Sequence, residues 1–163
     1  RYSFFPFPKA PNSLDTVLGR PNSFNHLSAL SLSGSRVDDF SLRHIHHLPR
    51  LSTLYLDNTG ISNEAVYLLV PLKHTLTRLS LATNPDVNSE SAPAMLLLAK
   101  LDFLSLMGTS VDIVGLRLLA KTIFEEGRDI DIEIPYSCEH YIDSEYFPRL
   151  PKVKVQPSKR PPV

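Results

Sequence analysis

The chain has 163 residues, with 17 lysines and arginines against 17 aspartates and glutamates, so its formal net charge is zero. One domain of this length can bury a substantial apolar core, and the balanced charge argues against a general nucleic-acid-binding surface. The single cysteine, Cys138, excludes an internal disulfide, and no apolar run approaches the ~18 residues of a membrane span, so we expect an intracellular protein, cytoplasmic or nuclear, without membrane contact.

Residues 1–26 are expected to form an N-terminal cap turn. Three aromatic residues near the start, Tyr2, Phe5 and Phe7, each stand 25 residues before a leucine of the regular pattern described next. Pro6 falls inside this predicted strand, and proline suits only an edge strand of a sheet.

An apolar pattern recurs four times within residues 27–128. Each copy has apolar residues at its first, fourth and sixth positions, and the copies start at 27, 51, 76 and 101, in steps of 24, 25 and 25 residues. One such turn cannot bury its own leucines, so successive turns must stack into a continuous core. Each copy therefore predicts a short strand, and the residues between its apolar positions point outward.

The segments that follow these strands have the spacing and caps of helices. Phe40, Leu42, Ile45 and Leu48 recur at helical spacing, and the segment ends before Pro49. Three further helices are predicted: residues 64–69 capped by Ser62 or Asn63, residues 89–98 opened by Ser89 and Glu90, and the longest, from an Asp112 cap to near Gly127.

Residues 129–157 are expected to form irregular C-terminal turns, and residues 158–163 a disordered tail. Ile130, Ile132 and Ile134 alternate as the residues of a buried strand do. If the last two strands pair in register, acidic residues oppose lysines in two places: Asp131 opposite Lys152, and Glu133 opposite Lys154.

The repeat length lies within the roughly 20–29 residues of leucine-rich repeats, and the chain resembles that family over most of its length. The resemblance implies an α/β fold: a right-handed solenoid over residues 1–157, with a parallel concave sheet and convex helices. About seven turns are expected, including the degenerate end turns.

The bend after each strand usually carries asparagine in this family, because its side chain can bond the backbone of neighbouring turns. Here the bend residues are Ser35, Thr59, Asn84 and Thr109. The bends that start at Thr59 and Thr109 resemble those of the cysteine-containing subclass, common in F-box proteins, although the cysteine of that subclass is missing. The resemblance implies the substrate-receptor part of an F-box protein.

No catalytic arrangement is found in the sequence. It has no glycine-rich phosphate loop, nucleophile elbow or His-Glu-x-x-His pair, so we expect no enzyme, no cofactor and no small-molecule substrate. His44 and His47 are only two converging ligands, and zinc needs three or four. Cys138 stands near acidic residues that disfavour its thiolate, so no reactive cysteine is expected.

Function is expected on the outward-facing residues of the concave sheet, because solenoids bind partners through such faces. Tyr, Phe, Met and Arg are the types enriched in interface cores. The predicted partner-binding residues are Tyr55, Asp57, Arg78, Phe103 and Met107, with Asp102 at their margin. The alternative for Phe103 is that it lies on neighbouring side chains of its own chain.

Two functions remain open at this stage. One is a non-catalytic protein–protein interaction module, which the resemblance narrows to a substrate-recognition domain of an F-box-type ubiquitin ligase. The other is a scaffold or assembly subunit of a larger complex that contacts partners through its convex helices or its ends. A nucleic-acid partner is disfavoured, and the sequence leaves the oligomeric state open.

Overall fold

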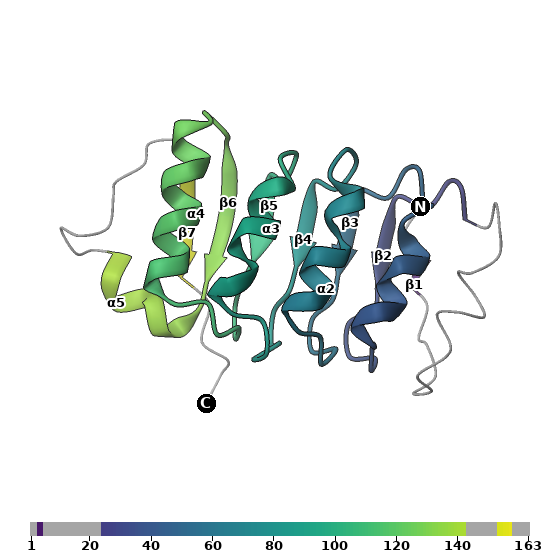
Figure 1. Cartoon of the computed structure of the whole chain (residues 1–163), viewed down its shortest axis with the longest axis horizontal. Coiled ribbons are helices and arrows are strands. Elements are labelled where there is room, and N and C mark those ends of the chain that lie inside the picture. Colours follow the sequence, from purple (N-terminus) through teal and green to yellow (C-terminus); the bar gives the residue numbers. More distant parts are fainter. Residues whose placement is uncertain (1–2, 5–23, 143–152, 158–163) are drawn as a thin grey trace.

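The computed structural model describes residues 3–4, 24–142 and 153–157 (Figure 1). The predicted tail at 158–163, and the predicted cap turn apart from residues 3–4 and 24–26, lie outside this range. Among the described residues, no helix has the length and apolar character that a membrane crossing requires.

The described residues form an α/β structure with one parallel sheet, which confirms the predicted class. The strands lie side by side in chain order, and each pairs in parallel with the next. They are β1 Ser3–Phe4, β2 Ala29–Ser31, β3 Thr53–Tyr55, β4 Arg78–Ser80, β5 Phe103–Ser105, β6 Ile130–Ile134 and β7 Val153–Pro157.

Helical segments cover one face of this sheet, and η1, α2, α3 and α4 pack side by side over it (Figure 1). Most are short, and the longest is α4. Their bounds are η1 Asp39–Ile45, α2 Asn63–Leu68, η2 Val70–Leu72, η3 Ser89–Ser91, α3 Ala92–Leu97, α4 Ile113–Glu125, η4 Tyr136–Cys138 and α5 Glu139–Ile142.

The core lies between the sheet and the helices. The central residue of each middle strand faces it, and these residues pair in register from strand to strand: Leu30, Leu54, Leu79, Leu104 and Ile132. All five are at most 1% exposed. The apolar pattern thus locates the four regular strands and their buried faces correctly, because burial of the leucines depends on stacking against the next turn.

Two predicted helix caps are confirmed, and a third cap lies at a residue that was not predicted. The Ser62 side chain accepts a hydrogen bond from the Glu64 amide, and the Asp112 carboxylate accepts one from the Gly115 amide at 3.0 Å. Ser89, predicted to open the next helical segment together with Glu90, is the first residue of η3. Asn88 takes the capping position and accepts a hydrogen bond from the Glu90 amide at 2.9 Å.

The segment after β2 is a 3₁₀ helix, and one residue predicted on its apolar face is exposed. A 3₁₀ helix has 3.0 residues per turn, so Leu42 and Ile45, three residues apart, share its buried side, and Leu48, just beyond its end, is buried too. Phe40 lies off this buried side and is 60% exposed. The α-helical period that placed Phe40 with the leucines does not apply here.

The end strands pair two residues away from the predicted register. Asp131 pairs with Lys154 rather than Lys152, and Glu133 pairs with Gln156 rather than Lys154. At the other end, Ser3 rather than Phe5 pairs with Leu30. A shift of two residues keeps each residue on the same face of the sheet, so an alternating apolar pattern cannot distinguish the two registers.

Among the bend residues, Asn84 joins two successive turns through its side chain, whereas the hydroxyls of Ser35 and Thr109 donate within their own turns. Its side-chain nitrogen donates to the carbonyl oxygens of Leu56 at 2.8 Å and Leu81 at 3.0 Å. Its side-chain oxygen accepts from the amides of Thr59 at 3.1 Å and Gly60 at 3.0 Å. Asn84 thus makes the bonds to a neighbouring turn that are expected of asparagine at this position.

Candidate functional site

The predicted partner-binding residues lie on the face of the sheet opposite the helices. We call this face, formed by the outward-pointing residues of β2 to β6, the open sheet face. Along its middle row Thr53, Arg78, Phe103 and Asp131 pair in register on neighbouring strands. The strand period of two places them all on this face, because the residue that follows each of them points into the core.

Arg78 holds three of the predicted residues together. Its guanidinium carbon lies 4.4 Å from the centroid of the Phe103 ring, and its Nη1 lies 3.8 Å from Oδ1 of Asp102. The side chains of Arg78 and Asp102 are 45% and 62% exposed. At such exposure the ion pair contributes about 0–1 kcal/mol and the cation–π contact about 0.5–1 kcal/mol.

The other predicted residues are less closely connected. An Asp57 carboxylate oxygen accepts a hydrogen bond from the Ser80 hydroxyl on the next strand. Asp57 is therefore engaged with Ser80, whereas Arg78 pairs with Asp102. Tyr55 and Met107 are both half-buried on β3 and just beyond β5. The structure thus groups Arg78, Asp102 and Phe103, and leaves Tyr55, Asp57 and Met107 around them.

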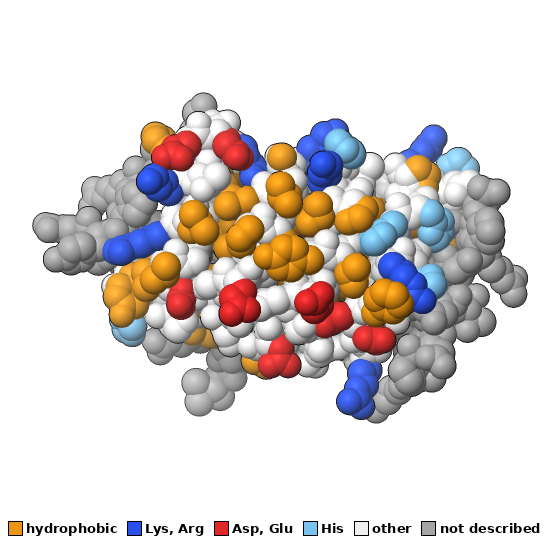
Figure 2. Space-filling view, viewed as in Figure 1, with side chains coloured by type: hydrophobic (Ala, Val, Ile, Leu, Met, Phe, Trp, Pro, Cys, Tyr) orange, Lys and Arg blue, Asp and Glu red, His pale blue; other side chains and the backbone are white. Residues whose placement is uncertain are grey.

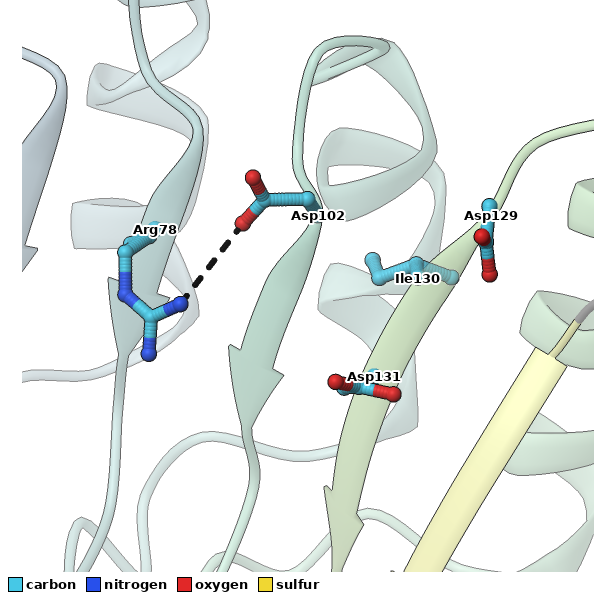
Figure 3. Close-up of a pocket in the computed structure, with 5 residues that line it drawn as sticks. All are labelled: Arg78, Asp102, Asp129, Ile130 and Asp131. Atoms are coloured by element: carbon cyan, nitrogen blue, oxygen red, sulfur yellow. Dashed lines mark ion pairs between the residues drawn. The ribbon is translucent and has the colours of Figure 1, made fainter.

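A pocket of about 270 Å³ adjoins this group where β4, β5 and β6 begin (Figure 3). Arg78, Asp102, Asp129, Ile130 and Asp131 line it. Three carboxylates and one guanidinium give the lining a formal charge of 1 − 3 = −2. Its volume is below the roughly 300–1,000 Å³ of pockets that enclose drug-sized ligands, and suits a single side chain better.

Sequence reasoning missed Asp129 as part of this site. The sequence pattern assigns Asp131 to an electrostatic contact with a lysine of the last strand rather than to a pocket. A signal was available, because Asp129 and Asp131 are two residues apart and therefore share a face of the strand. Their strand lies next to that of Phe103, through the pairing of Phe103 with Asp131.

The single cysteine, Cys138, is buried and is not placed to act as a nucleophile. It is 1% exposed, and burial raises the pKa of its thiol. The thiol lies 3.7 Å from the Val111 carbonyl oxygen and donates to it. The predicted disfavoured thiolate is confirmed, but burial is the main cause and the charge of Asp112 a smaller one. Within the described ranges, no group of three or more His, Cys, Asp or Glu side chains is placed to hold a metal ion.

The helices present a second surface, which the sequence analysis names as the contact surface of a scaffold or assembly subunit without naming its residues. Figure 2 shows hydrophobic side chains gathered across the middle of the helical side of the molecule. The large apolar residues exposed on η1, α2, α3 and α4 are Phe40, Tyr67, Leu97, Val114, Leu118 and Phe124. On the open sheet face, by contrast, Tyr55, Phe103 and Met107 are only half-exposed. We call the surface formed by Tyr67, Leu97, Val114 and Leu118 the helix face.

Comparison with known proteins assigns no family, because no protein-family profile matches the chain and no curated protein matches it.

Proposed function

We propose that the chain is a right-handed leucine-rich repeat solenoid of about seven turns that binds a protein partner, without catalysis, through its open sheet face. The four apolar copies on successive parallel strands support the solenoid. The asparagine bridge from Asn84 to the turn of Leu56 supports it as well, because this is the role that the family gives to its bend asparagine.

The observation that carries the binding function is the pocket beside the stacked Arg78–Phe103 pair. A partly exposed aromatic ring with a guanidinium over it offers a flat, preorganised contact, and Tyr, Trp and Arg dominate the energetics of protein interfaces. The 3.8 Å pair of Arg78 with Asp102 is exposed and weak, so a partner can replace it at small cost. The adjoining pocket then receives one side chain of the partner.

The resemblance of the bends to those of F-box proteins extends this proposal to a substrate-recognition domain of a ubiquitin ligase. In that role the open sheet face holds the protein that is to be modified. The expected sign is that proteins bound by this face become more abundant when the protein is depleted from cells.

Affinity capture from a cell extract tests the proposal with the wild-type chain and two variants. The test variant is Arg78→Ala with Phe103→Ala, which removes the stack but no buried core residue. The matched control is Leu97→Asp, which changes an exposed apolar residue on the opposite side. All three should show similar thermal melts. We expect the test variant to lose a set of proteins that wild type and Leu97→Asp both retain. Equal capture by all three would rule out the open sheet face as the binding site.

A second candidate function is assembly into a larger complex through the helices. The specific observation in its favour is that the most exposed large apolar side chains lie on the helical side, with Val114 at 70% and Leu97 at 54%. Burial of apolar area is the main driving force of most protein association. In this case Leu97→Asp, and not the Arg78 and Phe103 variant, weakens assembly.

A further inference from the structure

We propose that the helix face is a self-association surface on which a second copy of the chain docks, with a two-fold axis along the row of helices. This inference rests on the second candidate function and specifies its partner. It is independent of the protein partner on the open sheet face.

The centre of the helix face is apolar and preorganised. Tyr67, Leu97, Val114 and Leu118 are 46%, 54%, 70% and 46% exposed, and they come from three neighbouring helices. The Tyr67 hydroxyl donates to the Glu90 carbonyl oxygen at 3.0 Å, which anchors the ring towards the next turn. A band that crosses several helices differs from the scattered single apolar residues of ordinary surfaces, and marks an interaction site.

Opposite charges flank this band on its two margins. Each helical segment begins at one margin and ends at the other. Figure 2 shows mostly acidic side chains along the lower margin of the view, with a basic one at its right end, and basic side chains and histidines along the upper margin except at its left end, where acidic ones lie. The exposed acidic residues at the helix starts are Asp38, Glu64, Glu90 and Asp112. The exposed basic residues and histidines that follow the helices are His47, Arg50, Lys73, His74 and Lys100. The helix dipole favours this order of charges.

This charge order selects the symmetry of the complex. When two copies face each other across a two-fold axis that runs along the row of helices, the acidic margin of each meets the basic margin of the other. A two-fold axis that runs parallel to the helices instead would bring the two acidic margins together and the two basic margins together. A two-fold interface uses the same patch on both copies, so the patch must be self-complementary. The zero net charge of the chain adds no overall repulsion.

The charge complementarity belongs to η1, α2 and α3 rather than to α4. The end of α4 carries the exposed acidic residues Glu125 and Glu126. Lys121 lies 3.9 Å from Glu125 and partly offsets this charge. We therefore place the centre of the contact at Tyr67 and Leu97, with Val114 and Leu118 extending it.

Charge reversal distinguishes a second copy from any other partner. One variant, Lys73→Glu with Lys100→Glu, makes both margins acidic. The other, Glu64→Lys with Glu90→Lys, makes both margins basic. All four side chains are exposed, so both variants should fold. Each variant repels its own copies, but a mixture of the two restores opposite charges at both margins of a mixed dimer.

The measurement is sedimentation velocity over a concentration series, with native mass spectrometry of the mixture. We expect wild type to dimerise, Leu97→Asp and each charge variant to remain monomeric, and the mixture to form the mixed dimer. A monomeric wild type overturns the proposal. So does a dimer that survives Leu97→Asp or either charge reversal, and so does a mixture that forms no mixed dimer.

The Arg78→Ala, Phe103→Ala variant separates this proposal from the one on the open sheet face. It should dimerise as wild type does, because its changes lie on the opposite side of the sheet. Loss of its captured proteins with an intact dimer supports the open sheet face alone. A monomeric wild type that still captures proteins through Arg78 and Phe103 overturns self-association and leaves the open-face proposal standing.

Discussion

Replacement of Asn84 tests whether the turns are held together by the buried side chain that bridges them. Asn84 is fully buried, and its two side-chain atoms bond the backbone of its own turn and of the turn before it. In Asn84→Ala, the amides of Thr59 and Gly60 lose this acceptor. The carbonyl oxygen of Leu56 loses one donor but keeps the Thr59 hydroxyl at 2.7 Å.

The structure sets the size of the effect. A buried polar group left without a partner costs about 1–3 kcal/mol. Thr59 is 2% exposed, so its amide bears the full penalty, whereas Gly60 is exposed and water can bond its amide. We therefore expect Asn84→Ala to lower the free energy of unfolding by about 1–3 kcal/mol, a large share of the ~5–15 kcal/mol of a whole domain.

Thr109→Val is the matched control at an equivalent bend. The Thr109 hydroxyl donates only within its own turn, to the Leu106 carbonyl oxygen at 2.7 Å, so its loss should cost about 0.5–1.5 kcal/mol. Asn84→Asp keeps the acceptor but places a buried negative charge beside the Leu56 and Leu81 carbonyl oxygens, and should cost the most.

Urea denaturation with a common slope measures all three differences. An Asn84→Ala variant no less stable than Thr109→Val would refute the bridge, and an Asn84→Asp variant more stable than Asn84→Ala would refute the assignment of donors and acceptors.

Two further predictions concern the last regular turn, and a third concerns Cys138 beyond it. Asp112→Ala should lower stability by about 1 kcal/mol at pH 7 through loss of the cap. Hydrogen bonds from Gly115 and Ser89 hold the pKa of Asp112 below its ordinary value of 3.8, so thermal melts should show the difference in full above that pH and shrinking as pH falls below it; a constant difference contradicts this. Gly115→Ala should destabilise by about 1–3 kcal/mol despite the better helix propensity of alanine, because the new Cβ would lie 2.3 Å from the Ser89 hydroxyl oxygen. Ser89→Gly in the same chain should relieve this loss in denaturation experiments, and if it does not, the contact is not the cause. Cys138 should react with a thiol reagent only after unfolding, and rapid labelling of the native chain would contradict its burial.

The regular strands could be predicted because their leucines are required by a general constraint. A turn of about 25 residues cannot bury its own apolar residues, so Leu54, Leu79 and Leu104 must face the same core in register. The Ser62 and Asp112 caps could be predicted for a similar local reason, because the first amides of a helix need acceptors.

A row of hydrogen bonds joins the starts of successive helices. It could not be predicted, because a different residue type accepts the bond in each turn. The Asp39 carboxylate accepts from the Ser62 amide and hydroxyl, and the Asn63 side-chain oxygen accepts from the Asn88 amide at 2.9 Å. The Ser89 hydroxyl oxygen accepts from the Asp112 amide at 3.0 Å. Aspartate, asparagine and serine accept these hydrogen bonds at similar but not identical repeat positions, so no repeated residue marks this row of bonds in the sequence.

The pocket depended on distances that the sequence does not contain. The strand period correctly placed Arg78 and Phe103 on one face, and the structure adds that Arg78 turns towards Asp102 and not towards Asp57. Whether Arg78 pairs with Asp57 or Asp102 depends on side-chain rotamers and on the Ser80 hydroxyl, which donates to Asp57. The helix face depended on the exposed fractions of Tyr67, Leu97, Val114 and Leu118, which are set by how the neighbouring helices pack.

The two faces differ in what a partner must displace. On the open sheet face, Asp57 and Glu133 accept hydrogen bonds from Ser80 and Ser105, and Arg78 already covers the Phe103 ring. A partner there exchanges existing polar contacts for new ones, and exchange of this kind contributes more to specificity than to affinity. On the helix face, Leu97 and Val114 have only water to displace, so burial itself provides the driving force. Binding at the open sheet face should therefore depend strongly on the identity of the partner residue, whereas association through the helix face should depend mainly on apolar area and on the charge order at its margins.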